Sequence, residues 1–347
     1  MRVLITTSAD TEMWHYTSTL ADDLATTHGV ETLLVSLGGK PSADQLSMVR
    51  VGLRTGGGSI ELEHQDFPLE QDVAPVEQYA TARQVLLDLA LRWRTHVLHA
   101  NEYHLGEVGN NGMPVLVVAH NDLCSRRVAL EGETPPLVDS SYLSLVKKGL
   151  AAASSVVAPT TFMADSLSRW LDYHGVVRII PNGIAEHRGG MASVRTIGVV
   201  MAGRLWDPAA NLECYQVAAS KLSDRSFVAV GPTAPPGKTG KPLADNPIRF
   251  TGVIPDVELR QLLGSARLFV SPAFYDPNGL AVTEAAYSGC CLVLSDIPAY
   301  RALWEDAAVY FDPRDPSALC DRIGDLLENI AQRHTLAGLA RDRAQAL

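Results

Sequence analysis

The sequence has little of what would direct it to a polyanion or into a membrane. Among its 347 residues, 39 Asp and Glu outweigh 29 Lys and Arg, which gives a formal net charge of −10. Nucleic-acid-binding proteins and proteins on anionic membranes usually carry a basic patch, so this balance disfavours nucleic acid and membrane as main partners. No run approaches the ~18 uninterrupted apolar residues of a membrane-spanning helix. The first residues, MRVLITTSAD, also lack the long apolar core of a signal peptide.

Cysteine is scarce, and no two cysteines have the spacing of a C-x-x-C motif. An odd number of cysteines without that motif fits neither a zinc ribbon nor a disulfide scaffold, so we expect reduced thiols and a cytoplasmic location. The ten histidines show no metal-site spacing, and a D-x-D motif is absent. The sequence therefore predicts no metal centre. The cysteines are Cys124, Cys214, Cys290, Cys291 and Cys320.

Aromatic residues are few, at 6%, but hydrophobic residues make up 46% of the chain, enough for packed cores rather than disorder. The length predicts two domains of ~150–190 residues. Short apolar runs alternate with segments of helical spacing, which is typical of parallel sheets covered by helices on both faces. The runs are RVLIT (2–6), ETLLVSL (31–37), THVLHA (95–100), PVLVVAH (114–120), SVVAP (155–159), VVRII (176–180), TIGVVMAG (196–203), SFVAVG (226–231), IRFTGV (248–253), ARLFVS (266–271), CLVLSD (291–296) and AAVYFD (307–312).

The apolar runs fall into two sets. The first closes at IIPNG, and the poorly patterned IAEHRGGMASV that follows reads as a linker. We therefore predict an α/β protein with two Rossmann-like, doubly wound domains, 1–184 and 185–325, facing across a cleft, and a helical tail over 326–347. Ligands of such sheets bind at the carboxyl ends of the strands. TGGGS (55–59) has the composition of a phosphate loop, but no helical pattern follows it, so it predicts a turn between strands.

One loop and helix, FYDPNGLAVTEAAYSG, carry polar residues directly after a strand. The amides at a helix start are unpaired donors that favour anions, above all phosphates, so Asn278, Gly279 and Leu280 are candidate donor-binding residues. Glu284, about a turn further in, is placed to accept hydrogen bonds from hydroxyl groups. The alternative is structural: Glu284 complements the helix dipole and Asp276 caps the helix.

Two further loops follow strands of the second set. AGRLWDPAANLE places Arg204 at the end of a strand, where its guanidinium can bind a diphosphate through two hydrogen bonds. FTGVIPDVEL provides a turn at Val253 and Ile254 that suits a flat base held against the backbone. Both loops are expected at the same edge of the sheet as the loop before Glu284.

These segments resemble the family-4 retaining glycosyltransferases of the GT-B fold. The resemblance covers most of the chain and is carried by PNG (181–183), GRLWDPAANLE (203–213), FTG (250–252) and above all YDPNGLAVTEAAYSGCCLVLSDIPAYRALW (275–304). It implies a hexosyltransferase that moves a sugar from a nucleotide-diphosphate donor to a small soluble acceptor, with retention of configuration. We take a UDP-sugar as the default donor. The C-terminal helix is expected to return toward the N-terminal domain.

The resemblance also implies roles for individual residues. Glu284 would hold the ribose hydroxyls and Asp276 would contact hydroxyls of the sugar. Arg204 and the amides at 278–280 would neutralise the departing diphosphate, so no metal is expected. His120, at the end of the strand in VVAHND, would lie near the reacting sugar. A histidine that is only hydrogen-bonded at a strand end is the alternative.

The sequence departs from the family's pattern at several positions. Ala210 stands where the family usually has a lysine, which removes one cation from the diphosphate site. The first acid of the motif is Asp rather than Glu, and the glycine-rich turn after the first strand is replaced by SADTEMWHYTSTLADDL. Trp14 and His15 in that segment, with Arg126, are candidate acceptor-side residues. Helix-start packing and a solvated arginine are the alternatives.

Three functions remain open on the sequence alone. An active glycosyltransferase is the leading interpretation. The alternative is a degenerate relative, a nucleotide-sugar-binding or scaffold subunit without turnover, which the missing lysine and glycine turn favour. A nucleotide-sugar epimerase on the same architecture is the third, although Glu284 and the PNG segment fit transfer better.

Overall fold

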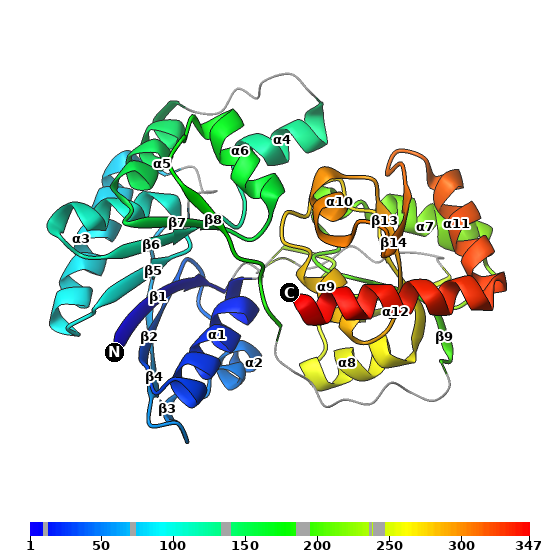
Figure 1. The fold of residues 1–347 in the computed structure, drawn as a ribbon, viewed down its shortest axis with the longest axis horizontal. Coiled ribbons are helices and arrows are strands. Elements are labelled where there is room, and N and C mark those ends of the chain that lie inside the picture. The colour runs from blue at the N-terminus through cyan, green and yellow to red at the C-terminus, as the bar shows by residue number, and fades with distance from the viewer. Residues whose placement is uncertain (10–12, 70–73, 133–139, 185–194, 236–237, 239–246) are drawn as a thin grey trace. The chain divides into compact units, whose positions relative to one another are not determined.

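The computed structural model describes residues 1–9, 13–69, 74–132, 140–184, 195–235, 238 and 247–347 (Figure 1). The chain divides into two compact units. The first comprises Met1–Arg127 and Thr134–Gly183, and the second comprises Val128–Glu133 and Ile184–Leu347. Residues 185–194, most of the predicted linker, lie outside the described ranges.

The first unit is built on an eight-stranded sheet with the order β3-β4-β2-β1-β5-β6-β7-β8. All neighbouring strands are parallel except β3 and β4, whose antiparallel pairing makes TGGGS a turn between strands, as predicted. The order reverses direction between β1 and β5, which creates a topological switch point there. The strands are β1 (Arg2–Ser8), β2 (Glu31–Leu37), β3 (Gly52–Leu53), β4 (Ser59–Gln65), β5 (Val97–Ala100), β6 (Val115–Val118), β7 (Ser155–Ala158) and β8 (Val177–Ile179).

Helices cover both faces of this sheet because the strands are apolar on both sides. In β1, Leu4 joins the core cluster that contains residues of α3, α6 and the 3₁₀ helix η1, whereas Val3 and Ile5 join the cluster that contains residues of α1. The helices are α1 (Met13–Thr27), α2 (Ala43–Met48), α3 (Val76–Arg92), η1 (Tyr103–Asn111), α5 (Ser140–Ala152) and α6 (Thr161–Leu171), together with α4 (Leu123–Glu131), whose residues are divided between the two units after Arg127.

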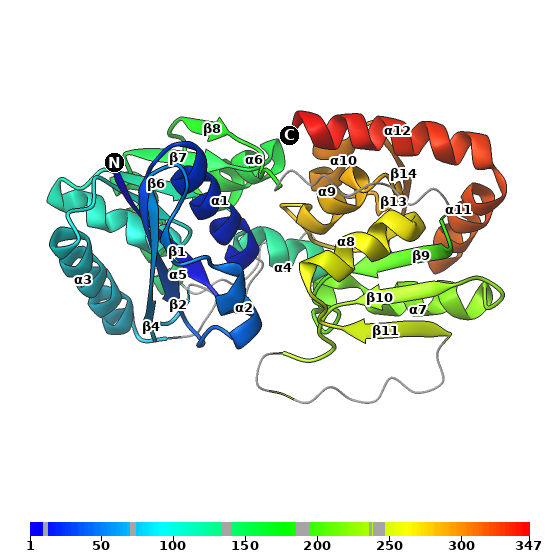
Figure 2. The same ribbon diagram turned by 90° about the horizontal axis from the view of Figure 1, so that it is seen from below.

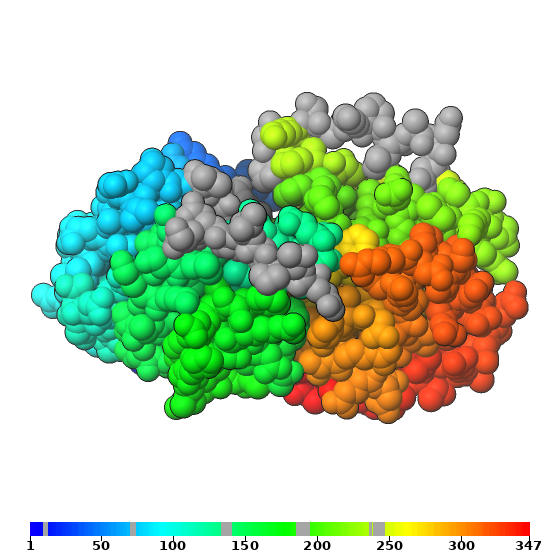
Figure 3. Space-filling view, turned by 90° about the horizontal axis from the view of Figure 1, so that it is seen from above, coloured from blue at the N-terminus to red at the C-terminus, as the bar shows by residue number. Residues whose placement is uncertain are grey.

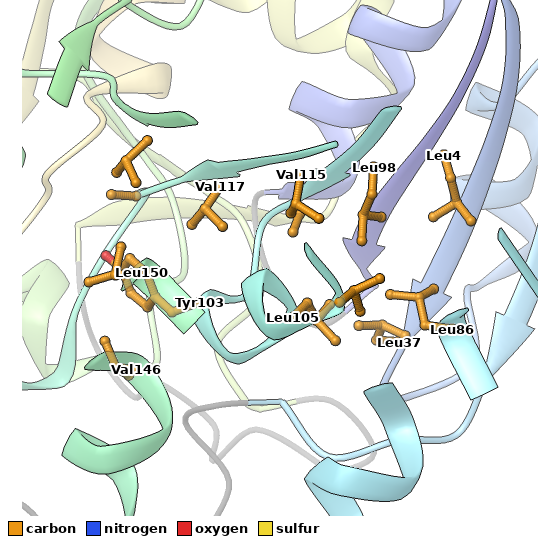
Figure 4. Packing of buried hydrophobic residues seen from close by; sticks show 14 of the residues in the cluster. Leu4, Leu37, Leu86, Leu98, Tyr103, Leu105, Val115, Val117, Val146 and Leu150 are labelled. Carbon is orange, nitrogen blue, oxygen red and sulfur yellow. The ribbon is translucent and has the colours of Figure 1, made fainter. Parts of the chain in front are cut away.

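Two glycines let η1 and α5 approach each other closely. A Cβ atom on Gly149 would lie 1.8 Å from the carbonyl oxygen of Tyr103, and one on Gly106 would lie 2.1 Å from that of Gly149. Only glycine is compatible with such a backbone contact. Figure 4 shows the core beside it, where Leu98 of β5 points toward Leu105 of η1.

The second unit has a six-stranded, entirely parallel sheet with the order β11-β10-β9-β12-β13-β14. Counted from β9, this is the doubly wound order 3-2-1-4-5-6, with its switch point between β9 and β12. The strands are β9 (Ile197–Ala202), β10 (Phe227–Val230), β11 (Ile248–Gly252), β12 (Ala266–Ser271), β13 (Cys291–Ser295) and β14 (Ala308–Phe311). All twelve predicted runs coincide with strands, six in each unit.

Two sets of helices sandwich this sheet. Helices α7 and α11 share one core cluster with Val199 and Met201 of β9, while α8, α9, α10 and α12 share the other with Val200. The atoms of α7 (yellow-green) and α11 (orange-red) adjoin in Figure 3. The helices are η2 (Pro208–Ala210), α7 (Leu212–Lys221), α8 (Asp256–Ser265), α9 (Leu280–Tyr287), α10 (Pro298–Trp304), α11 (Pro316–Glu328) and α12 (Ile330–Ala346).

The C-terminal helix α12 packs within the second unit. Ala340 and Ala344 are buried in the cluster that contains α9, and α12 runs beside α9 in Figures 1 and 2. The boundary predicted after residue 325 falls inside α11. The predicted return of the tail toward the N-terminal domain remains a prediction.

All five cysteines are free, as the cysteine pattern predicts, and the structure buries every one of them. Burial raises the pKa of the Cys290 and Cys291 thiols to about 12, so both stay protonated and serve as small apolar side chains of the core.

Candidate active site

The loop between β12 and α9 is fastened by one carboxylate. Oδ1 of Asp276 accepts a hydrogen bond from the backbone N–H of Gly279 at 2.9 Å, and Oδ2 accepts one from the hydroxyl of Tyr300 at 2.8 Å. The same hydroxyl lies 2.6 Å from Oγ of Ser271, the last residue of β12. Asp276 therefore shapes the start of α9, which is the capping role considered as the alternative to sugar binding.

This arrangement involves one of the predicted donor amides. The amides of Asn278, Gly279 and Leu280 are predicted as phosphate donors, and in this structure the Gly279 N–H donates to Asp276. The helix begins at Leu280, and Thr283 is the first residue whose N–H reaches back, to the carbonyl oxygen of Gly279 at 2.8 Å. The first-turn amides from Leu280 onward are those that helix geometry leaves without an intrahelical acceptor.

Glu284 lies one turn inside α9. Its carbonyl oxygen accepts the N–H of Ser288, and its side chain is half-buried. Thr283 beside it is buried, and its hydroxyl donates to the carbonyl oxygen of Gly279 at 2.9 Å. Glu284 is thus the carboxylate in the interior of this helix, at the depth that the sequence predicts.

The loop after β9 is tied to its neighbours through Asn211. Its side-chain Nδ2 donates to the carbonyl oxygens of Pro272 and Pro313, both at 2.9 Å, and the Phe274 N–H donates to the carbonyl oxygen of Ala209 at 2.8 Å. These bonds join the loops that follow β9, β12 and β14 at one edge of the sheet. The loops of Arg204 and Asp276 are therefore neighbours at the switch point.

Arg204 itself is held loosely. Its guanidinium lies 3.6 Å from a carboxylate oxygen of Asp207, with 38% of the arginine side chain exposed and 7% of the aspartate. Asp207 also accepts the N–H of Ala209 and so starts the short helix η2. Ala210, where the family usually has a lysine, is half-buried at the end of η2.

The turn after β11 carries the two residues predicted to face a base. Gly252 ends the strand with a φ of +69°, the side chain of Val253 is 72% exposed, and Ile254 packs at the edge of the core cluster with α8 and α9. The turn thus presents one exposed apolar side chain at the carboxyl end of the sheet.

In the first unit, His120 lies in a buried polar cluster at the carboxyl ends of β1, β5 and β6. Its Nε2 is 3.0 Å from Oδ1 of Asn101, the residue after β5. Asn101 in turn donates from Nδ2 to the carbonyl oxygen of Thr6 at 2.5 Å. The ring of Tyr16 lies edge-on to the imidazole, with 4.8 Å between centroids. The sequence predicts His120 at a strand end but gives no sign of Asn101.

Burial controls the protonation of two neighbours of His120. It lowers the pKa of His99 to about 4, against a hydrogen bond to Asn101 that raises it, and it raises the pKa of Tyr16 to about 12. Both side chains are therefore neutral near pH 7. His99 is 7% exposed, and no partner of its Nε2 is found among the residues that the structure describes.

The three acceptor-side candidates have different surroundings. Trp14 is 3% exposed, and its indole N–H donates to the carbonyl oxygen of Gln45, so it packs in the core and presents no face to a ligand. This burial agrees with helix-start packing, the alternative considered for Trp14, and an acceptor-side role remains a prediction. His15 and Arg126 are half-buried, on α1 and α4. Glu12, in the same segment as Trp14, lies outside the described residues.

Two family descriptions match the chain and together span most of it. Residues 11–183 match "Glycosyl transferase 4-like domain", and residues 196–329 match "Glycosyl transferases group 1". The chain belongs to the GT-B glycosyltransferases. These matches and the two doubly wound sheets confirm the resemblance to family-4 glycosyltransferases and the predicted fold of two Rossmann-like domains.

Curated relatives match over a short segment. The O-antigen chain mannosyltransferase B of Escherichia coli is 35% identical over 96 residues, which are 27% of this chain and 25% of the relative. The glycogen synthase of Mycobacterium tuberculosis is 34% identical over 97 residues, or 27% of this chain and 23% of the relative. The matched part therefore spans about a quarter of the length of these relatives.

Solved structures resemble this glycosyltransferase over its whole length. Sucrose-phosphate synthase from Thermosynechococcus elongatus superposes with a TM-score of 0.77 at 20% identity, covering 100% of this chain and 94% of the other. Anabaena HepE in complex with UDP-glucose gives 0.70 at 17% identity, covering 100% and 95%. At these identities the likeness shows the fold.

Two further observations concern what the chain could hold. In the described ranges, no three or more His, Cys, Asp or Glu side chains are grouped so that they could bind a metal ion. Nor does any described helix combine the length and apolar character needed to cross a membrane.

Proposed function

We propose that this glycosyltransferase moves a hexose from a UDP-sugar to a small soluble acceptor in the cytoplasm, with retention of configuration and without a metal. The observation that supports the proposal is the bonding of the loop that carries Arg204 to the loop that opens α9, at the switch point of the second sheet, where doubly wound domains bind nucleotides. UDP is supported by the HepE structures, which contain UDP or UDP-glucose.

The chemistry needs stabilisation of negative charge as the diphosphate departs. The first-turn amides of α9 and the guanidinium of Arg204 are the donors available for this, each worth up to ~3 kcal/mol when well aimed. The ion pair with Asp207 is long, at 3.6 Å, and the Arg204 side chain is 38% exposed, so the guanidinium can exchange this contact for one with a phosphate. In this proposal Leu280 and the amides after it, rather than Gly279, bind the phosphate oxygens.

Glu284 is proposed to hold the ribose hydroxyls. Glu284→Ala removes an acceptor for two hydroxyl donors, and hydrogen bonds to a charged group are worth ~1.5–3 kcal/mol, so UDP affinity should fall at least about tenfold. Glu77→Ala, on the exposed face of α3 in the first unit, is the matched control. Calorimetric titration with UDP measures both. Unchanged affinity in the Glu284 variant removes this residue from the site.

Turnover is tested separately, with a panel of UDP-, GDP- and ADP-sugars and mass spectrometry of products formed in a cell extract. Full activity in EDTA is expected, and activity that manganese alone restores would refute metal independence. The engaged carboxylate of Asp276 favours the second candidate, a nucleotide-sugar-binding protein without turnover. Thermal stabilisation by a donor with no nucleotide released from any donor would support that candidate.

A further inference from the structure

Asn101 has a side-chain orientation that its neighbours determine. Its backbone N–H donates to the hydroxyl oxygen of Thr6 at 3.0 Å, and its Nδ2 donates to the Thr6 carbonyl oxygen at 2.5 Å. A carbonyl oxygen only accepts hydrogen bonds, so the amide nitrogen must face Thr6 and the amide oxygen must face the other way. Thr6 of β1 thus holds both the backbone amide and the side-chain amide nitrogen of Asn101, the residue that follows β5.

The fixed amide oxygen determines the proton on His120. Oδ1 of Asn101 lies 3.0 Å from Nε2 of the imidazole, and an amide oxygen can only accept. Nε2 therefore carries a proton, and in the neutral ring that proton defines the tautomer. His120 is 3% exposed, so water does not compete for this bond. The edge of Tyr16 limits rotation of the ring from one side.

We propose that Asn101 is a positioning residue for the transfer reaction, which holds His120 in its Nε2-protonated form and fixes the direction of its ring. The proposal rests on the proposed function and on the role that the family resemblance implies for His120, near the reacting sugar. It extends that function by assigning the orientation of His120 to a chain of two bonds, from Thr6 through Asn101. The chain lies at the switch point of the first sheet, between β1 and β5.

A second imidazole lies beside this group. His99, two positions before Asn101 on β5, is 7% exposed. The ring of Tyr16 lies 6.1 Å from that of His99 and 4.8 Å from that of His120. Tyr16 thus contacts both buried imidazoles, and Asn101 is hydrogen-bonded to the one that the proposal concerns, His120.

The first test reads the tautomer and needs no turnover. Proton–nitrogen correlation spectra of protein with isotopically labelled histidine distinguish the two neutral tautomers, and the His120 signal is identified by its loss in His120→Gln. The wild type should show Nε2–H, and Asn101→Ala should show a mixture of tautomers. A wild-type His120 protonated at Nδ1 overturns the proposal, whether or not the protein transfers a sugar.

The second test is kinetic. Asn101→Ala should lower kcat tenfold or more, because small misplacements of a contacting group cost up to ~100-fold, with KM for the donor changed less than about threefold. Asn101→Asp keeps an acceptor for the Nε2 proton and should recover part of the loss. Asn110→Ala, exposed at the end of η1, is the control. Wild-type kcat in Asn101→Ala, or no recovery in Asn101→Asp, contradicts the proposal. Absence of turnover in the wild type contradicts only the proposed function.

Discussion

Tyr300 donates its hydroxyl to Asp276 at 2.8 Å, across 24 residues of sequence, and so links helix α10 to the loop that opens α9. The hydroxyl also contacts Oγ of Ser271 at 2.6 Å, and the Tyr300 side chain is fully buried. The loop therefore takes its shape from a residue that follows it in the chain. The start of α9, the proposed phosphate site, is held from both sides by this bond and by the cap on Gly279.

Tyr300→Phe should weaken both folding and nucleotide binding. Loss of the hydroxyl leaves Asp276 with one bond fewer in a partly buried place, which costs ~1–3 kcal/mol in the free energy of unfolding. Urea denaturation measures that cost, and titration with UDP should show about threefold to tenfold weaker binding. Tyr173→Phe in the first unit is the control. A variant with wild-type stability and affinity would show that the bond does not shape the site.

Gly279→Ala should destabilise the protein while the same change at Gly324 stabilises it. Gly279 has a φ of +62°, and a Cβ atom there would lie 3.1 Å from Cδ1 of Leu303. A left-handed alanine costs ~1–2 kcal/mol, before any contact. Gly324 lies in the middle of α11 with open space at its Cβ position, so alanine there should add ~0.5–1 kcal/mol. Thermal denaturation of the pair measures both signs, and equal shifts would refute the argument.

The sequence predicts the strands better than the contacts between them. Each apolar run corresponds to a strand, because a strand that is buried on both faces has apolar residues at successive positions instead of at every second one. β4 does alternate, in SIELEHQ, and was not among the runs. The close approach of Gly106 and Gly149 could not be predicted, because nothing local to either glycine indicates the other.

The candidate site divides in the same way. Arg204, Glu284 and His120 follow or enter elements whose positions in the sheets the sequence predicts, so their places at strand ends could be inferred. The surroundings of Trp14 and Asn101 could not be inferred from the sequence, because these residues bond to partners 31 and 95 residues away. An aromatic residue at a helix start has the same local sequence whether it faces a ligand or the core.

The free energy of unfolding should fall as the pH drops from 7 to 5, in part through His99. The unfolded side chain takes up a proton near pH 6.5, whereas burial lowers the pKa in the folded protein to about 4. Between these values the unfolded state binds more protons, so stability rises with pH and is lost on acidification. His99→Gln should lose about 2 kcal/mol less than the wild type between pH 7 and 5.

Urea denaturation at the two pH values tests this expectation, with exposed His28→Gln as the control. Burial also lowers the pKa of His104 to about 4, so this residue acts with the same sign. The effects of His99→Gln and His104→Gln on the change in unfolding free energy between pH 7 and 5 should therefore add. A His99→Gln protein that loses as much stability as the wild type would show that His99 does not resist protonation.

Ala210→Lys should strengthen UDP binding if the second unit holds a diphosphate beside Arg204. Ala210 ends η2, and Asn211 after it is anchored to Pro272 and Pro313, so the backbone at this position is fixed near the loop that opens α9. A lysine there adds a cation without a new loop. Because hydrogen bonds to charged groups are worth ~1.5–3 kcal/mol and the new side chain loses rotamer freedom, we expect the affinity for UDP to rise about threefold to tenfold.

Calorimetric titration of the Ala210→Lys variant at low and high salt should show this gain in affinity shrinking with salt, since screening weakens exposed charge pairs. Ala210→Gln, similar in length but uncharged, should show no such gain. Equal affinities for the lysine and glutamine variants at low salt would mean that no diphosphate lies within reach of this position.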